Sequence, residues 1–287
     1  MTRYIVTSRQ DAVARNGSPY INIKIASVEN GNETVCVFDV AKDMGPMVGQ
    51  VVEFTNLRDY QGKKSTTRAE MKVSPEPNET DPLYNLIPRP IKKKEWDECI
   101  GALCNMCNDE NIKSIITEQA QTLFDLYIQY PASATVHHAY PGGLLNHTYQ
   151  MLHMLEGIFP TIPYKEEMKI ERCILAIMFH DWGKTREYTK DGEYTKYMYL
   201  LGHIYMSAQM IQTILKRAGI DKEEINLIVH CVLAHHGELE YGSPVKPATP
   251  EAQLVNYLDN ISAKADIFNT TGDMEKSFFL GTHVVKS

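Results

Sequence analysis

The stretch LAIMFHDWGKTREY, residues 175–188, places a histidine and an aspartate side by side at the end of an apolar run. Burying two ionisable groups together costs free energy unless a partner compensates them. A chain that contains this stretch must therefore fold so that other polar groups, or a ligand, meet His180 and Asp181.

Four further segments have the periodicity of amphipathic helices, and each places an ionisable residue on its apolar face. These segments and residues are 142–159 with His147, 203–220 with His203, 221–238 with His235, and 251–268 with Asp259. His236 is the immediate neighbour of His235, whereas His153 shares the polar face of its helix with Gln150 and Glu156. A single inward histidine is usually a hydrogen-bonded core residue, but five separate elements with the same feature predict a common polar centre.

A divalent metal is the usual ligand that makes such a buried cluster stable. The donor set mixes imidazole and carboxylate groups without thiolates, which suits Mn²⁺, Fe²⁺, Co²⁺, Ni²⁺ or Zn²⁺ better than Ca²⁺. The donors are too numerous for one ion. Two ions about 3.5–4 Å apart, bridged by a carboxylate, would use them all.

The first 73 residues predict a small β-domain. Five short alternating or β-branched runs, with a break between the third and the fourth, fit the strand order of an OB-type barrel: 4–9, 18–27, 34–40, 50–57 and 67–74. In the second run Ile21, Ile23 and Ile25 alternate with polar or small residues, and residues 59–64 predict a hairpin turn between the last two runs. Such barrels bind single-stranded nucleic acid through aromatic and basic side chains on one face. Candidates for that face are Tyr20, Phe38, Phe54, Tyr60, Arg58, Lys63, Lys64 and Arg68. The alternative is that these aromatic rings fill the barrel and the charged groups only face solvent.

Residues 74–94 contain five prolines in 21 residues and predict a semi-extended linker. The helical pattern begins at Glu95. The expected fold class is therefore α+β with two domains. An OB-type barrel (1–73) and the linker (74–94) precede an all-α domain (95–287).

Composition excludes several classes of protein. The hydrophobic fraction of 43% and the charged fraction of 23% are those of a globular protein. No apolar run approaches the roughly 18 residues of a membrane span, and the N-terminus lacks the pattern of a signal peptide. We therefore expect a cytoplasmic protein without a membrane partner.

Cysteines and charge add two weaker indications. The six cysteines include one C-x-x-C, Cys104 and Cys107, without a second pair, so reduced core thiols are favoured over a zinc or redox site. Residues 1–94 carry 14 Lys and Arg against 11 Asp and Glu, a net of +3, and the remainder carries 15 against 25, a net of −10. This asymmetry is compatible with a polyanionic substrate guided by the first domain.

The order His147, His180–Asp181, Asp259 resembles the signature of the HD superfamily of metal-dependent phosphohydrolases. The phrases HHAYPGGLLNHT (137–148), HDWGK (180–184), LGHI (201–204) and AHHGELEYGSPVKPATPEA (234–252) are similar to those of YhaM-type 3′-to-5′ exoribonucleases. That resemblance implies an OB-fold joined to an HD domain. It also implies divalent-metal-dependent removal of nucleotides from single-stranded RNA, with some action on DNA.

The resemblance also implies roles for the buried residues. His147, His180, Asp181 and Asp259 would hold a first metal ion, and Asp181 would bridge to a second ion held also by His203 and His235. His236 would be a further ligand or contact the scissile phosphate. Lys184, three residues after Asp181, is positioned to reach the phosphate; the alternative is a surface lysine after a helix end. Manganese is the expected metal, and Asp181, Lys184 and His236 are the expected catalytic residues.

Substrate contacts are less strongly indicated by the sequence. The loop GELEYGSPVKP carries Tyr241, Ser243 and Lys246, which would stack a base and hold a phosphate, although such a loop also suits any helix connection. His138, next to His137, would line the pocket or serve as a cap. Arg58 and Lys63 would contact the substrate from the first domain.

Three functions remain open from the sequence. The first is a metal-dependent exoribonuclease acting on single-stranded RNA or DNA. The second is an HD-type phosphohydrolase of a small nucleotide, such as a cyclic mono- or dinucleotide, with the first domain as a regulatory or homo-oligomerisation module. The third is a non-catalytic protein that binds single strands, against which the complete ligand set argues.

Overall fold

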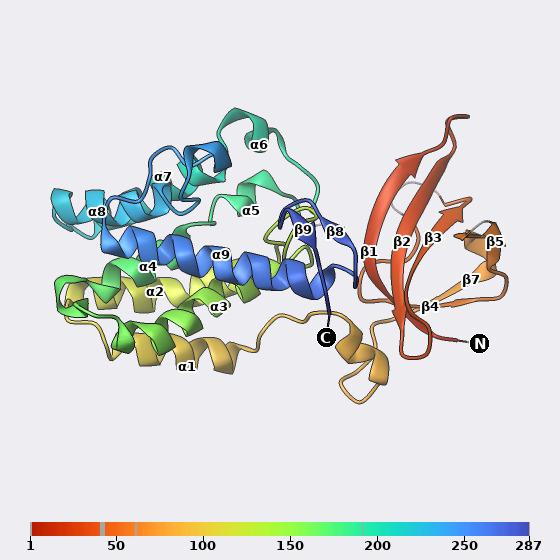
Figure 1. Ribbon diagram of the computed structural model, residues 1–287, viewed down its shortest axis with the longest axis horizontal. Helices are drawn as coiled ribbons and strands as arrows, with labels where there is room; N and C mark the ends of the chain where they lie inside the picture. Colours follow the sequence, from red (N-terminus) through yellow and green to blue (C-terminus); the bar gives the residue numbers. More distant parts are fainter. Residues whose placement is uncertain (1, 41–43, 61, 191, 287) are drawn as a thin grey trace. The chain divides into compact units, whose positions relative to one another are not determined.

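The computed structural model (Figure 1) describes residues 2–40, 44–60, 62–190 and 192–286. The chain divides into two compact units, Met1–Arg89 and Pro90–Ser287. The first unit is built on a β-sheet and the second on helices, so the predicted α+β class with an OB-like first domain is confirmed.

The first unit contains a seven-stranded sheet in the order β5-β6-β3-β2-β1-β4-β7. Its strands are β1 (Tyr4–Val13), β2 (Pro19–Ser27), β3 (Gly31–Phe38), β4 (Val51–Phe54), β5 (Arg58–Tyr60), β6 (Lys63–Thr67) and β7 (Met71–Ser74). β1 pairs antiparallel with both β2 and β4, and its register shifts between Val6 and Ser8. β3 pairs parallel with β6. The sheet therefore curls into an OB-like half-barrel.

The alternation noted in the sequence fills the inside of this half-barrel. Ile21, Ile23 and Ile25 of β2 are buried, and they pack with Val35 and Val37 of β3 in one apolar cluster. Because side chains of a strand point alternately to its two faces, the residues between them are available to the outer face.

The fourth and fifth predicted strands are more broken than expected. Residues 50–57 and 67–74 were each predicted to be one strand, but β4 ends at Phe54, and the short 3-10 helix η1 (Arg68–Glu70) precedes β7. The Glu70 carboxylate accepts from the backbone N–H of Thr67 and pairs with Arg58, which stabilises this interruption. β5 and β6 pair antiparallel on either side of the predicted turn at 59–64, of which Gln61 lies outside the described residues.

The segment expected to be a linker contributes to the first unit. It contains the 3-10 helix η2 (Pro82–Leu86), which begins where the Asp81 carboxylate accepts from the backbone N–H of Leu83. Leu83 and Ile87 are buried against Ile5 and Val51. Leu83, Leu86 and Ile87 thus pack on the sheet, and the proline-rich segment is extended only in part.

The second unit is helical, apart from a short hairpin near its C-terminal end. Its elements are α1 (Lys93–Cys104), α2 (Glu110–Tyr127), α3 (Gly143–Ile158), α4 (Ile170–Phe179), α5 (Lys184–Glu187), α6 (Lys196–Leu200), α7 (His203–Arg217), α8 (Lys222–Leu233), α9 (Pro250–Thr270), β8 (Lys276–Ser277) and β9 (Thr282–His283). Among the residues that the structure describes, no helix is long and apolar enough to cross a membrane.

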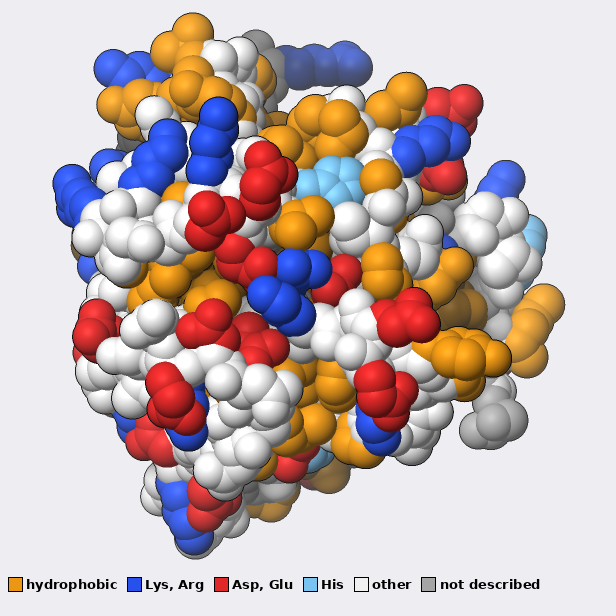
Figure 2. Space-filling model, turned by 90° about the vertical axis from the view of Figure 1, so that its left-hand side faces the viewer, with side chains coloured by type: hydrophobic (Ala, Val, Ile, Leu, Met, Phe, Trp, Pro, Cys, Tyr) orange, Lys and Arg blue, Asp and Glu red, His pale blue; other side chains and the backbone are white. Residues whose placement is uncertain are grey.

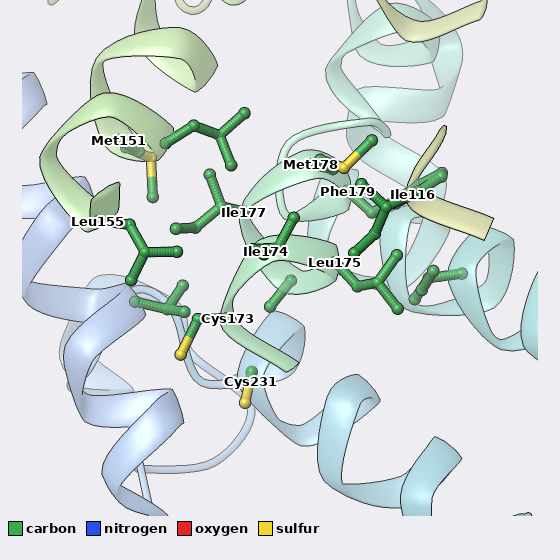
Figure 3. Close-up of a cluster of buried hydrophobic side chains, with 14 of the residues drawn as sticks. Ile116, Met151, Leu155, Cys173, Ile174, Leu175, Ile177, Met178, Phe179 and Cys231 are labelled. Carbon is green, nitrogen blue, oxygen red and sulfur yellow. The ribbon is translucent and has the colours of Figure 1, made fainter. Parts of the chain in front are cut away.

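Helix α4 is the central element of this unit. Nearly all of its side chains are buried, and it contacts α2, α3, α7, α8 and α9. Figure 3 shows its residues Ile174, Leu175 and Ile177 among side chains of neighbouring helices. A helix that is apolar on all sides must lie inside the bundle. Because α4 ends at Phe179, the His180–Asp181 pair that follows is delivered into the interior.

At the opposite end of the helical unit, where α4, α8 and α9 begin, charged groups form a network. Arg172 binds Glu224 at 2.8 Å and Glu251 at 3.0 Å, and Lys169 also binds Glu224. Basic and acidic side chains lie interspersed on the face that Figure 2 shows. The negative charge of the second domain is therefore locally compensated on this face.

Candidate metal centre

Five parts of the helical unit bring the sequence-predicted ligands together. His147 comes from α3, the His180–Asp181 pair follows α4, and His203 opens α7. His235 and His236 follow α8, and Asp259 belongs to α9. His147, His180, Asp181 and His235 are at most 2% exposed. Residues up to 112 positions apart therefore meet at one buried place.

Asp181 lies at the middle of this group. Its Oδ2 atom is 3.2 Å from His180 Nε2 and 3.7 Å from His147 Nε2. Its Oδ1 atom is 3.5 Å from His203 Nε2 and 3.8 Å from His235 Nε2. The two carboxylate oxygens thus face two different pairs of imidazoles. Asp259 lies beside the pair formed by His147 and His180, since its Oδ1 is 3.1 Å from His147 Nε2.

The hydrogen bonds of the outer ring nitrogens fix which nitrogen carries the proton. Three histidines contact backbone carbonyls through Nδ1: His180 with Ile177 at 2.8 Å, His235 with Val232 at 2.7 Å, and His236 with Tyr241 at 2.8 Å. A carbonyl oxygen only accepts, so Nδ1 must be the N–H in each ring. In the neutral rings Nε2 therefore presents a lone pair, as metal-binding histidines do.

His147 is oriented by a longer chain of hydrogen bonds. The Ser262 hydroxyl donates to Gln150 Oε1 at 2.8 Å, so its oxygen accepts from His147 Nδ1 at 2.9 Å. His147 Nε2 then carries a lone pair, and it lies 3.2 Å from His180 Nε2. Two lone pairs at this distance repel each other unless a proton or a cation lies between them.

His203 is held by a carboxylate that the sequence analysis missed. Glu187, 2% exposed, lies with both carboxylate oxygens 3.2 Å from His203 Nδ1 and also accepts from the His203 backbone N–H. Gly183 allows the chain before Glu187 to pass close to the backbone of His203, because a Cβ at position 183 would lie 2.3 Å from the His203 backbone oxygen. Glu187 belongs to a four-residue helix, which is too short to show a periodicity. Only its position a few residues after His180 and Asp181 in the sequence would have indicated a role in this site.

Three buried polar atoms of the predicted ligands have no hydrogen-bond partner in the described part of the chain: Asp181 Oδ1, His203 Nε2 and His235 Nε2. Unpartnered buried groups are costly in a folded protein. Groups of such donors here satisfy the spacing of metal ligands, namely His147–His180–Asp181 and His203–His235–His236. The residues therefore fit a divalent metal.

The electrostatics of the centre agree with this fit. Burial alone would raise the pKa of Asp181, but the neighbouring His180 and Lys184 outweigh it and hold that pKa well below its usual range. Burial, followed by the nearby His236, lowers the pKa of His235 well below its usual range. Burial also lowers the pKa of His147, so a charged Asp181 lies beside neutral His147 and His235, the protonation state that metal coordination requires. At His180 burial is outweighed by Asp181, which raises the pKa of that imidazole.

The two remaining predicted catalytic residues lie beside these ligands. Lys184 is 7% exposed, and its Nζ lies 2.7 Å from Asp181 Oδ2, so it is not a surface lysine. The His236 ring lies 4.4 Å from that of His235 and 5.2 Å from that of His203. Burial lowers the pKa of His236, which favours its neutral form.

The predicted substrate-binding residues of the loop after α8 have different surroundings. Tyr241 is exposed, and its carbonyl orients His236. Ser243 is buried, with its hydroxyl directed at the carbonyls of Leu233 and Val245, which differs from the expected phosphate contact. Lys246 is exposed and pairs with Glu238 at 2.5 Å.

His138 is buried rather than open to a pocket. Its Nε2 contacts Gln150 Oε1 at 3.1 Å, and its Nδ1 lies 3.3 Å from Nδ1 of His137. Both of its ring nitrogens therefore have protein partners, in contrast to the expected substrate contact. Its neighbour His137 is half-buried, with its ring 5.1 Å from that of His147.

The predicted nucleic-acid face of the first unit is partly neutralised. Arg58 pairs with both carboxylate oxygens of Glu70, and Lys64 pairs with Glu33 at 2.7 Å. Lys63 is exposed, and Tyr20 and Phe38 stack with ring centroids 5.6 Å apart. The face thus keeps aromatic rings, but Arg58 and Lys64 already have acidic partners.

All six cysteines are free thiols, including both members of the C-x-x-C. Cys107 Sγ donates to the backbone carbonyl of Leu103, and Cys104 is buried. Two further groups in the described part of the chain have metal-ligand spacing: His137–His138–His147 and Cys99–His153–Glu156. In the latter, His153 is exposed and pairs with Glu156 at 3.2 Å. The sequence expectation of a solvated His153 agrees with this position.

Comparison with known proteins gives the class of this fold and site. The HD domain family model matches residues 144–264, the range that holds the ligands from His147 to Asp259. Residues 144–264 thus match an HD domain, and the chain is a metal-dependent hydrolase.

A particular relative then agrees with the resemblance noted in the sequence. The 3′-5′ exoribonuclease YhaM of Bacillus velezensis is 26% identical over 275 residues, which cover 91% of this chain and 83% of the relative. The similarity to YhaM-type exoribonucleases is thereby confirmed. No solved structure matches the chain.

Proposed function

We propose that this protein is a divalent-metal-dependent phosphodiesterase that removes nucleotides from the 3′ end of single-stranded RNA. The observation that carries the proposal is the set of ring-nitrogen lone pairs directed at the two oxygens of Asp181. The related exoribonuclease, similar over most of both chains, supports the choice of polymer.

Asp181 would be a ligand shared by both groups of imidazoles. Its Oδ2 faces His147 and His180, while its Oδ1 faces His203 and His235. We infer that Asp259 joins the first pair and His236 the second. Mn²⁺ is the proposed metal, because mixed imidazole and carboxylate donors suit it. When bound, such ions would make hydroxide available near neutral pH and would neutralise phosphate oxygens.

The chain's own residues then position and neutralise the substrate. Lys184 Nζ is buried beside Asp181 Oδ2 and places a positive charge next to the proposed metal ligands. There it would neutralise an oxygen of the substrate phosphate. A fixed cation in a buried site stabilises developing negative charge more strongly than one in water. His236 Nε2 accepts a hydrogen bond or coordinates, since its Nδ1 is committed to Tyr241.

The test is a time course with 5′-labelled single-stranded RNA and Mn²⁺ on a denaturing gel. We expect a ladder that shortens from the 3′ end, is lost on chelation, and is absent in Asp181→Ala. Full activity of Asp181→Ala, with its fold intact by circular dichroism, would refute the scheme. The same time course with a 5′-labelled single-stranded DNA of the same sequence shows whether the protein prefers RNA or DNA.

One observation favours a second candidate, hydrolysis of a small nucleotide. The pairing of Arg58 with Glu70, and of Lys64 with Glu33, reduces the positive charge that the first unit can offer to a polyanion. An intact RNA in the gel assay, together with metal-dependent hydrolysis of a cyclic dinucleotide, would establish this candidate instead.

A further inference from the structure

A cluster of exposed aromatic and aliphatic side chains surrounds α6, outside the metal centre. We call it the α6 surface, and it consists of Tyr194, Tyr197, Tyr199, Leu200, Leu201 and Tyr205. Its four tyrosines are between 39% and 78% exposed. None of the α6 residues is buried, so this helix has no face packed into the core. Exposed apolar side chains gathered in one place mark an interaction site more often than scattered ones do.

The α6 surface is tied directly to the metal centre. The Thr195 backbone N–H donates to the carbonyl of Glu187 at 2.7 Å, and the carboxylate of Glu187 holds His203. At the other end of α6, the carbonyl of Tyr197 accepts from Gly202, the residue before His203. Figure 1 shows α6 at the outer side of the helical unit, between α5 and α7. Backbone hydrogen bonds therefore link α6 to the residue that holds His203 and to the residue that precedes it.

The side chains of the α6 surface suit the bases of a nucleic acid strand. The rings of Tyr194 and Tyr199 lie edge to face, with centroids 6.3 Å apart, and Tyr194 also packs against the Tyr188 ring at 5.4 Å. Tyr194 is 50% exposed and Tyr199 78%. Every base has a π-face, so exposed aromatic rings bind single strands without reading their sequence. Lys196 Nζ lies 5.4 Å from the Tyr197 ring centroid and adds a positive charge for the phosphates between the bases.

We propose that the α6 surface stacks the bases of single-stranded RNA next to the 3′ end that enters the metal centre. This inference rests on the proposed exoribonuclease function and names where that function binds its substrate. It assigns to Tyr197 and Tyr199 a role in binding the strand, and none in the hydrolysis of the phosphodiester.

The first arm of the test measures binding without hydrolysis. Fluorescence anisotropy with a 5′-labelled single-stranded RNA in EDTA gives Kd for the full-length protein and for Tyr197→Ala and Tyr199→Ala. Loss of a stacking contact is expected to weaken binding at least about fivefold. Tyr199→Phe keeps the ring and should retain the wild-type Kd. Tyr164→Ala is the matched control, since Tyr164 and Tyr199 are both 78% exposed.

The second arm separates strand binding from chemistry. With bis(p-nitrophenyl) phosphate, which has no bases, the tyrosine variants should keep the wild-type kcat and KM. With RNA they should raise KM and leave the gel ladder's 3′ polarity unchanged. A fall of kcat on both substrates would overturn the assignment, since it would mean that the variants disturb the metal centre.

The failure of this inference and that of the proposed function are distinguishable. If the wild-type protein shortens RNA and both alanine variants bind it with unchanged Kd, the α6 surface is not the binding surface, although the function stands. If the wild-type protein neither binds nor shortens RNA, both fail. If Tyr199→Ala instead converts a dimer to a monomer in sedimentation and leaves RNA binding unchanged, the surface joins two copies of this chain and the inference is wrong.

Discussion

The hydrogen bond between Glu187 and His203 gives the sharpest test of the proposed two-ion centre. The Glu187 carboxylate faces His203 Nδ1 and thereby leaves the lone pair on Nε2, which points at Asp181 Oδ1. Glu187→Gln keeps the size of this buried side chain but removes its charge and places an amide N–H near Nδ1. The ring is then free to carry its proton on Nε2, which blocks coordination.

The expected magnitude follows from the role of such supporting groups. Loss of a partner that orients a ligating histidine typically costs 10- to 100-fold in metal affinity, or about 1.4–2.8 kcal/mol. Only the ion next to His203 and His235 should be affected. The ion between His147, His180 and Asp259 should bind as in the wild-type protein.

The assay is isothermal titration calorimetry with Mn²⁺ on the metal-free full-length protein. Ser262→Ala provides the matched control, because Ser262 supports His147 through Nδ1 in the same way that Glu187 supports His203. Glu187→Gln should weaken Mn²⁺ binding at the site of His203, and Ser262→Ala should weaken it at the site of His147. If Glu187→Gln leaves both affinities within threefold of the wild-type values, or weakens both equally, the argument from ring orientation is refuted.

Three further predictions concern packing, charge and thiols. A Cβ at Gly183 would lie 2.3 Å from the His203 backbone oxygen, so Gly183→Ala should displace His203 and reduce bound Mn²⁺ from two ions to one by elemental analysis; two bound ions would contradict this. The Arg172 hydrogen bonds lower the pKa of Glu224 in the folded protein. The ion pair therefore stabilises the fold fully above the pKa of Glu224 in the unfolded chain, about 4.3, and this stabilisation is lost as the pH falls through the lower pKa of the folded protein. In urea unfolding, Glu224→Gln should therefore reduce the free energy of unfolding by about 1–3 kcal/mol at pH 7 and by less below pH 4, whereas a loss independent of pH would speak against the ion pair. Burial raises the pKa of Cys99 to about 12, so iodoacetamide at pH 8 should label it only after unfolding, and rapid labelling of the native protein would show that this thiol is accessible.

Much of the architecture follows from local patterns in the sequence. The alternation of Ile21, Ile23 and Ile25 predicted a strand with one buried face, and these side chains are buried in β2. The helical periodicity around His147 and His235 predicted that both would point inward, and neither is accessible to solvent. Local periodicity determines these features because it sets which side of an element is apolar, and the apolar side must be buried.

The short interruptions of the first unit could not be predicted in this way. Residues 67–74 read as one alternating strand, but the Glu70 carboxylate binds Arg58, which is far enough away in sequence to leave no local signal. A few hydrogen bonds from one side chain then outweigh a weak β preference in a stretch of this length.

For this protein, the sequence by itself determined which residues are candidates for the metal centre, since adjacent His180 and Asp181 after an apolar helix cannot be buried without partners. The tertiary structure decided how each one is used. It placed Glu187 and Ser262 behind two of the rings, and committed His138 and Ser243 to neighbours within the protein. These contacts join elements distant in sequence, and the direction of a hydrogen bond depends on where the partner's donor and acceptor lie in space.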